Sequence, residues 1–340
     1  MEERSEMEDL GRLNFWREKR VFVTGGTGIV GLNLINQLID LEAEVVVLVR
    51  DWVPRSRILG SWLQDTPDVT VVRGGLEDFD CIQRTIAEYE TECIFHLGAQ
   101  TIVNIGNRSP VTTFKANIQG TWNLLEAVRI LNSYSDGVKS VCVASSDKAY
   151  GTSEVLPYTE NMPLKGEHPY DVSKSCTDLL SQCYATSYQL PISVARMGNI
   201  YGPGDLNFNR IIPGTIKSLV EKKRPVIRSD GSPVREYFFV SDAVDAYLVM
   251  AEFLEKKKNY GQAFNFSSGE KINVLDLVNK IIASFGLDVT PLIMNDSKNE
   301  IRNQYLSIDK ARQLLNWSPK YRLDEGLQDT IPWYRDKVFV

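Results

Sequence analysis

The chain has few of the residues that metal centres, disulfide frameworks and membrane spans require. It holds two histidines, His96 and His168, which argues against zinc sites and histidine triads, so no metal is expected. The longest apolar run, near Val45, is far too short to span a bilayer, and residues 1–14 do not resemble a signal peptide. The cysteines lack metal spacing and a paired framework, so we expect reduced thiols in the cytoplasm: Cys81, Cys93, Cys142, Cys176 and Cys183.

Acidic residues also outnumber basic ones. The sequence has 38 Lys and Arg against 44 Asp and Glu, a formal net charge of −6, with a pI of about 5.3. This balance argues against nucleic acid or an anionic membrane as a partner. A chain of 340 residues, 43% of them hydrophobic, can bury a large core and favours two domains.

A glycine-rich turn follows the first strand-like segment. Gly25, Gly28 and Gly31 stand three residues apart and lead into a helix-period pattern, and a second strand follows at 44–49. Glycine lets a pyrophosphate approach the N–H groups at the helix N-terminus. We therefore predict a dinucleotide site rather than a flexible turn, with these residues at the cofactor: Gly25, Thr27, Gly28, Ile29, Gly31 and Ala99.

The end of the second strand bears on the choice between NAD and NADP. Val49 stands where an acidic residue often binds the ribose, and Arg50 and Asp51 follow it. An arginine suits a 2′-phosphate, whereas an acid accepts a hydrogen bond from the free 2′-hydroxyl of NAD. Arg50 favours NADP, Asp51 leaves NAD open, and a solvated Arg50 is the structural alternative.

Strands and helices alternate along the first two thirds of the chain, which predicts an α/β fold of the Rossmann type. This pattern gives a doubly wound parallel sheet whose ligands lie at the carboxyl ends of the strands. Long helices are expected at 111–132 and 171–189, and a shorter one near 210–222. Strands are expected near 20–24, 44–49, 69–73, 93–97, 139–145, 192–197 and 264–268.

The pattern loosens after Asn199, which predicts a smaller C-terminal lobe that binds a second ligand. We assign residues 15–198 to an NAD(P)-binding Rossmann domain, to which 236–268 returns, and residues 1–14 to a polar N-terminal tail. The remaining segments, 199–235 and 269–340, would form the substrate-binding lobe.

Tyr170 and Lys174 follow Pro169 at a spacing of four residues. Proline suits the first position of a helix, so both side chains are expected on one helical face. A lysine beside a phenol stabilises the phenolate and lowers the tyrosine pKa, as a base for a sugar hydroxyl requires. The structural alternative is a packed tyrosine and a solvated lysine.

Ser146, Asp147 and Lys148 follow the strand predicted at 139–145, where the fold places chemistry. A serine hydroxyl there can share the substrate proton with Tyr170, and an adjacent acid and amine suggest a second proton transfer. A structural turn is the alternative, because serine and aspartate are common turn formers.

The chain resembles the extended short-chain dehydrogenases/reductases, in their group of nucleotide-sugar epimerases and dehydratases. Asp147–Lys148 is similar to the corresponding pair of the CDP-glucose 4,6-dehydratases. The resemblance runs from about Phe15 to the chain's end and rests on TGGTGIVG, FHLGAQ (95–100), NIQGT (117–121), SSDKAYG (145–151), PYDVSK (169–174), RMGNIYGPGD (196–205) and REYFFVSDAVDAY (235–247).

The resemblance implies a nucleotide-sugar 4,6-dehydratase with a recycled nicotinamide cofactor. Tyr170, assisted by Ser146 and Lys174, would deprotonate the sugar 4-hydroxyl during hydride transfer. The resulting 4-ketone acidifies the C5 proton, and Asp147 would act as general acid while water leaves C6. Lys148 would remove the C5 proton if neutral, or stabilise the enolate if charged, and both roles stay open.

Family resemblance also implies contacts to a nucleoside diphosphate sugar. Arg235, Arg210 and Asn199 are candidates for its phosphates, because arginine binds phosphate bidentately. Gln100 and Asn104 are candidates for the sugar. Solvation of the arginines and hydrogen bonding within the loop are the structural alternatives.

The sequence leaves two other activities open and predicts a homodimer. A 4-epimerase would use Tyr170 and the cofactor but leave Asp147 and Lys148 without a role. An NADPH-dependent carbonyl reductase is suggested by residues 49–51. The long helices at 111–132 and 171–189 carry apolar residues on more than one face, and related enzymes pair such helices, so a homodimer is expected.

Overall fold

The computed structural model describes residues 10–51, 66, 68–135, 137–296 and 301–339. Seven strands form one sheet, in the order β10-β6-β5-β4-β1-β2-β3, and each neighbouring pair runs parallel. This confirms the predicted fold class. The strands are β1 (Arg20–Thr24), β2 (Glu44–Val49), β3 (Val69–Arg73), β4 (Cys93–His96), β5 (Ser140–Ala144), β6 (Ile192–Met197) and β10 (Gln262–Phe266).

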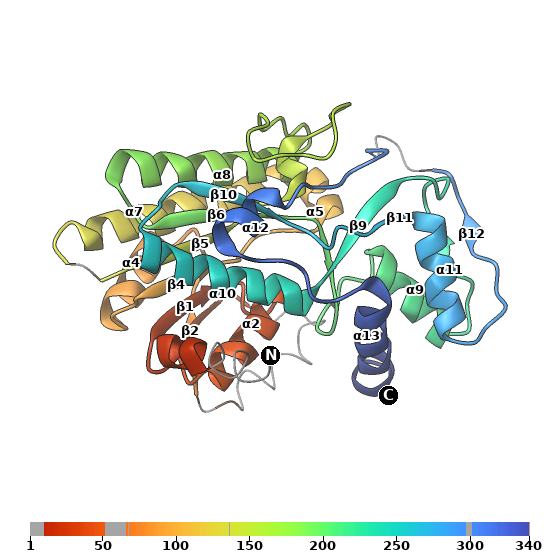
Figure 1. The fold of residues 1–340 in the computed structure, drawn as a ribbon, viewed down its shortest axis with the longest axis horizontal. Coiled ribbons are helices and arrows are strands. Elements are labelled where there is room, and N and C mark those ends of the chain that lie inside the picture. The colour runs from red at the N-terminus through yellow and green to blue at the C-terminus, as the bar shows by residue number, and fades with distance from the viewer. Residues whose placement is uncertain (1–9, 52–65, 67, 136, 297–300, 340) are drawn as a thin grey trace.

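Helices cover both faces of this sheet, as Figure 1 shows. Helices α2 (Ile29–Asp40) and α10 (Val240–Lys257) pack on one face, where Phe95 and Phe264 belong to the apolar core. The other face is covered by α4 (Phe79–Glu88), α7 (Gly120–Asn132) and α8 (Pro169–Tyr188). Because both faces are buried, strands such as β2 read as unbroken apolar runs.

The two long predicted helices exist, with adjusted bounds. Helix α8 begins at Pro169, which occupies the first helical turn as predicted. The helix expected at 111–132 is instead α6 (Pro110–Phe114), a π-helical turn η2 (Lys115–Gln119) and α7, preceded by α5 (Val103–Arg108). The π-helical turn interrupts a segment that was expected to be one regular α-helix.

A smaller lobe lies beside the sheet, at the right of Figure 1. It has its own apolar core, to which Ile216, Phe239 and Ile281 belong. A three-stranded sheet in the order β11-β9-β7 lies within it. Its elements are β7 (Asn199–Tyr201), α9 (Ile211–Val220), β8 (Val226–Ile227), β9 (Val234–Phe239), β11 (Lys271–Asn273), α11 (Val274–Ser284), β12 (Leu292–Ile293) and α13 (Leu323–Lys337).

The chain passes between the sheet and the smaller lobe several times. Strand β9 pairs in the small sheet, yet α10 and β10, which follow it, belong to the large one. Helix α12 (Asp309–Leu315) packs on α10 and β10. Residues 10–16 are helical, although residues 1–14 were expected to form a tail, and Arg12 pairs with Asp245 of α10 at 2.7 Å. The division into two domains stays a prediction.

The cysteines and the helices add two further observations. All five cysteines lie within the described residues and are free, with Cys81, Cys93 and Cys142 buried and Cys183 exposed. In the part of the chain that the structure describes, no helix is both long enough and apolar enough to cross a membrane.

Candidate active site

A cleft of about 1100 Å³ lies at the carboxyl ends of the sheet strands, between the sheet and the smaller lobe. The glycine turn after β1 forms one part of its wall, and the ends of β4 and β5 form the next. The smaller lobe contributes the facing wall. Twelve predicted site residues from the sheet side and three from the lobe line it: Gly25, Thr27, Gly28, Ile29, Gly31, Ala99, Asn104, Ser146, Asp147, Lys148, Tyr170 and Lys174, then Asn199, Arg210 and Arg235.

The glycine turn fits a bound dinucleotide. Gly25 has φ +77°, and a Cβ there would lie 2.7 Å from the backbone nitrogen of Gly98. Helix α2 is capped by Gly28, which has no side chain to bind the first backbone N–H groups of the helix. These N–H groups therefore stay available at a cavity wall, as an anionic pyrophosphate requires.

Arg50 and Asp51 lie at the end of β2, outside the cleft lining. They pair with each other, with 3.2 Å between Arg50 Nε and Asp51 Oδ2, and both side chains are 57% exposed. This geometry satisfies both charges locally and selects neither form of the cofactor. Their cofactor contacts stay predictions.

Lys174 is held underneath the cleft by the backbone of the sheet. Its Nζ donates a hydrogen bond of 2.6 Å to the carbonyl oxygen of Ala144, at the end of β5. The side chain is buried, and burial lowers the pKa of Lys174 to about 8 in spite of the nearby carboxylate of Asp178.

Tyr170 differs from the sequence-based expectation in its electrostatics. Burial raises the pKa of Tyr170 to about 12, and the hydrogen bond with Ser146 and the positive charge of Arg210 only partly oppose this rise. The expected lowering by Lys174 does not occur, because the lysine amine is directed to Ala144. Ser146 and Tyr170 do lie together, as the proton-sharing hypothesis requires.

Ser146, Asp147 and Lys148 belong to a short 3₁₀ helix. This helix, η3 (Asp147–Tyr150), is capped by Ser146, whose hydroxyl accepts from the backbone N–H of Lys148 at 3.2 Å. The same hydroxyl donates to Asp147 Oδ1 at 3.1 Å. Asp147 is buried, and Lys148 Nζ lies 3.8 Å from Asp147 Oδ2. An acid and an amine thus stand side by side in the cleft wall.

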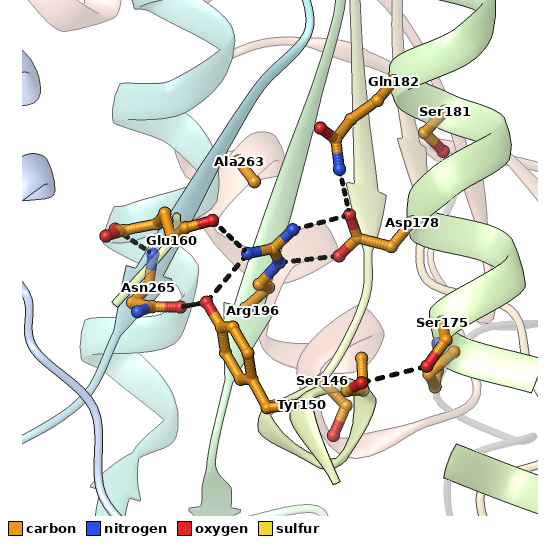
Figure 2. A network of polar contacts seen from close by, with 12 residues as sticks. Ser146, Tyr150, Glu160, Ser175, Asp178, Ser181, Gln182, Arg196, Ala263 and Asn265 are labelled. Atoms are coloured by element: carbon orange, nitrogen blue, oxygen red, sulfur yellow. Dashed lines mark hydrogen bonds and ion pairs between the residues drawn. The ribbon is translucent and has the colours of Figure 1, made fainter. Parts of the chain in front are cut away.

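A buried ionic network holds η3 and α8 against the sheet, as Figure 2 shows. Arg196 of β6 forms a bidentate pair with Asp178 of α8, at 2.8 and 2.9 Å. Arg196 Nη1 also donates to the Tyr150 hydroxyl at 2.8 Å, and this hydroxyl donates to Asn265 Oδ1 at 2.7 Å. One guanidinium therefore joins the element that carries Tyr170 and Lys174 to the element that carries Asp147 and Lys148.

The proposed phosphate ligands line the cleft but already have protein partners. Arg235 Nη1 donates to the carbonyl oxygens of Val234, at 2.8 Å, and Arg302, at 3.0 Å. Arg210 pairs with Asp205 at 3.2 Å. Asn199 donates to the carbonyl of Glu236 at 3.2 Å. These contacts orient the three side chains, and their ligand contacts stay predictions.

Gln100 makes hydrogen bonds within its own loop, which was the structural alternative to a contact with the sugar. Its Oε1 accepts from the backbone N–H of Ile102 at 3.0 Å, and it does not line the cleft. Its backbone is held by Asn117 of η2, which accepts from the Gln100 N–H at 2.7 Å and donates to its carbonyl at 3.1 Å. Asn104, in contrast, faces the cleft. Asn117 belongs to the NIQGT motif, but the motif alone did not predict its hydrogen bonds with the Gln100 backbone.

Comparison with known proteins agrees with this geometry. The sequence model of the GDP-mannose 4,6 dehydratase family matches residues 22–330. The chain is 31% identical to CDP-glucose 4,6-dehydratase of Salmonella typhimurium, over 95% of this chain and 92% of the relative. dTDP-glucose 4,6-dehydratase of Bacillus anthracis, solved in complex with NAD, is a structural neighbour with a TM-score of 0.80 and 25% identity, covering 94% of this chain and 97% of that one.

An epimerase is structurally as similar as the dehydratase. UDP-glucose 4-epimerase of Thermotoga maritima, solved with UDP-glucose, has a TM-score of 0.83 and 27% identity, covering 94% of this chain and 99% of that one. Fold and sequence thus define an enzyme of the short-chain dehydrogenase/reductase superfamily, in the group of nucleotide-sugar 4,6-dehydratases and 4-epimerases. Within this group, the chain belongs to the GDP-mannose 4,6 dehydratase family.

Proposed function

We propose that this enzyme is a nucleotide-sugar 4,6-dehydratase, with a CDP-hexose such as CDP-glucose as its first candidate substrate. The supporting observation is the side-by-side position of Asp147 and Lys148 in the cleft wall that also carries Tyr170. An epimerase needs one proton-transfer group at C4, whereas a dehydratase needs two further groups to remove water across C5 and C6. The 31% identity to a CDP-glucose 4,6-dehydratase supports the nucleotide.

The first step uses the residues of α8. Tyr170 removes the 4-hydroxyl proton, and the Ser146 hydroxyl holds the phenol in position. Lys174 adds positive charge beneath the site. A nicotinamide held at the glycine turn would supply the acceptor for the C4 hydride and the donor for C6. Because burial raises the Tyr170 pKa to about 12, this tyrosine needs added positive charge to act as a base near neutral pH.

The second step uses the residues of η3. The 4-ketone acidifies the C5 proton. Lys148 would remove this proton if its amine is neutral, or stabilise the resulting sugar enolate if the amine is charged. Asp147 donates a proton to the departing 6-hydroxyl. With 3.8 Å between Lys148 Nζ and Asp147 Oδ2, the two groups can act on neighbouring carbon atoms of one hexose.

The cofactor is a nicotinamide dinucleotide in this proposal, with its pyrophosphate at Gly25, Thr27 and Gly28. The free N–H groups at the start of α2 support this position. NADP would be favoured if the exposed Arg50 exchanged its pair with Asp51 for a 2′-phosphate, whereas the pair as it stands selects neither form. Arg235, Arg210 and Asn199 would hold the sugar nucleotide diphosphate on the facing wall.

Product masses test the proposal. Purified protein is incubated separately with CDP-, GDP-, UDP- and dTDP-glucose, and each product is analysed by mass spectrometry. A dehydratase product is lighter than its substrate by one water, and we expect this loss with the CDP-sugar. A product of unchanged mass would establish an epimerase instead, and stoichiometric consumption of NADPH would establish a reductase.

We also propose a cytoplasmic homodimer, paired through α7 and α8. Leu124, Leu125, Val128 and Leu131 of α7 are buried in the core of the protein and are not available to a partner. The exposed apolar side chains of the two helices are Trp122, Leu179 and Tyr188. The free cysteines agree with a reducing compartment. A monomeric mass in light scattering would refute the dimer.

A further inference from the structure

Gln304 lies beside Lys148 although 156 positions separate them in the chain. Lys148 Nζ donates a hydrogen bond to Gln304 Oε1. The Gln304 side chain is 1% exposed, and Gln304 is not among the residues that line the cleft. It therefore stands behind Lys148, as seen from the cleft, where it can hold the amine but not a substrate.

The orientation of the Gln304 amide follows from this contact. A lysine amine has hydrogens to donate, so the amide must present its oxygen to Lys148. Gln304 Nε2 is left without a hydrogen-bond partner among the residues that the structure describes. A buried amide nitrogen without a partner destabilises the folded state, so folding alone does not favour glutamine at this position.

The backbone around Gln304 is held from two sides. Its N–H donates to the carbonyl of Val234 in β9, at 3.1 Å. Two residues later, the N–H of Leu306 donates to Glu236 Oε2 at 2.9 Å. Tyr158 forms a parallel bridge with Leu306, and its carbonyl oxygen accepts from Asn265 Nδ2 at 3.1 Å. Residues 301–307 thus form a strap, and its position fixes the distance between the Gln304 amide and η3.

Carboxyl groups would otherwise compete for Lys148. Asp147 Oδ2 lies 3.8 Å from the amine, beyond hydrogen-bond length. Burial raises the pKa of Asp171, and the charges of Lys148 and Asp147 both act on this carboxyl. The hydrogen bond to Gln304 keeps this ion pair loose, because it holds the amine out of hydrogen-bond contact with Asp147, a contact that would occupy both groups at once.

From this geometry we propose that Gln304 is a positioning residue for the elimination step, holding Lys148 apart from Asp147 and directed at the C5 proton. This inference rests on the proposed dehydratase function. Gln304 contacts neither Tyr170 nor Lys174 in any hydrogen bond of the described residues, so it should leave oxidation at C4 unaffected.

The test compares the two steps in Gln304→Leu. Leucine keeps the volume, removes the oxygen acceptor and also removes the unpartnered amide nitrogen. We expect C5 deuterium exchange from D₂O and product formation to fall about 10- to 100-fold, the cost of a small misplacement. Formation of reduced nicotinamide in a single turnover should stay within about twofold of wild type, and thermal stability should not fall.

Two further variants separate positioning from folding. Gln304→Glu keeps an oxygen acceptor but adds a carboxylate, which would pair with Lys148 and favour its protonated form, so the C5 exchange rate should stay low. Ser307→Ala loosens the same strap by removing the 2.8 Å bond to Asp309, without touching Lys148, and should leave the ratio of the two steps unchanged. The readout is the ratio of the C5 exchange rate to the rate of nicotinamide reduction, because a merely structural role for Gln304 would not change this ratio.

Three results would overturn the inference. The first is wild-type C5 exchange in Gln304→Leu, and the second is an equal loss of both steps together with a lower melting temperature. If the wild-type enzyme removes water from none of the four nucleotide sugars, the proposed function fails and this inference fails with it. Dehydration by wild type together with either of the first two results refutes the inference alone.

Discussion

Two pairs of candidate proton-transfer residues line one cleft but are supported in different ways. Tyr170 and Lys174 lie one turn apart on a 20-residue helix that packs on the large sheet. Asp147 and Lys148 are adjacent residues of a four-residue 3₁₀ helix, and Lys148 is held by a strap that reaches it from the smaller lobe. The helix places its pair by local geometry, whereas the second pair depends on contacts between distant segments.

The different supports of the two pairs match the two steps of the proposed reaction. In the proposed mechanism the α8 pair needs a fixed distance to a cofactor at the glycine turn, and a long helix packed on the sheet provides it. The η3 pair would act on a substrate held by the facing wall. Support from the strap ties the position of Lys148 to β9, which also carries Arg235.

The largest expected effect comes from Tyr170→Phe, which tests the α8 pair. Without the phenol no group removes the 4-hydroxyl proton, so kcat should fall by roughly 10³–10⁴-fold. Reduced nicotinamide should not appear in a single turnover, because the first step is blocked. Ser145→Ala, next to the active serine, changes a hydroxyl without a partner among the described residues and serves as a stability control. Wild-type turnover in Tyr170→Phe would exclude this residue as the base.

Arg196→Met should damage both pairs together, because its guanidinium joins α8 to η3. Removing it leaves the carboxylate of Asp178 buried without its main partner, so the free energy of unfolding should fall by about 3–5 kcal/mol. Urea unfolding measures this loss. The double variant Arg196→Met/Asp178→Leu removes both charges and should regain most of the stability. A loss below about 1 kcal/mol in the single variant would contradict the role of the network.

Lys148→Met separates the two pairs. Because Tyr170 and Lys174 remain, oxidation at C4 should proceed while elimination slows by roughly 10²–10³-fold. Reduced nicotinamide should therefore accumulate, as single-turnover absorbance would show. Lys165→Met, on a lysine outside the cleft lining, is a matched control. Equal slowing of both steps would show that Lys148 is not confined to the elimination.

The smallest effect concerns the pH dependence of stability. Burial lowers the pKa of Lys174 from 10.5 to about 8, so between these values the unfolded chain holds more protons than the folded protein. Stability from this group therefore rises with pH across this window. Between about pH 7 and pH 10, wild type should gain roughly 2–3 kcal/mol relative to Lys174→Met. A difference that stays constant with pH in urea unfolding would contradict the buried position.

Local patterns predicted most of the fold and much of the site. The apolar runs predicted the strands of the large sheet, and Pro169 marked the start of α8. Gly25, Gly28 and Gly31 predicted the turn that lines the cleft. These features depend on residues within a few positions of one another, so their periodicity and backbone preferences are visible in the sequence.

Long-range contacts could not be predicted in this way. The sequence did not indicate that Lys174 donates to Ala144 or that Arg196 pairs with Asp178. The expected lowering of the Tyr170 pKa failed for the same reason, since burial depends on what packs around the ring.

The sequence by itself determined the order of strands and helices, the glycine turn and the spacing of Tyr170 and Lys174, because backbone sterics and hydrophobic periodicity act locally. Only the tertiary structure decided which distant groups meet: it brought Gln304 to Lys148 and joined α8 to η3 through one arginine. The physical reason is that hydrogen bonds and ion pairs act over a few ångströms in space, whatever their separation along the chain.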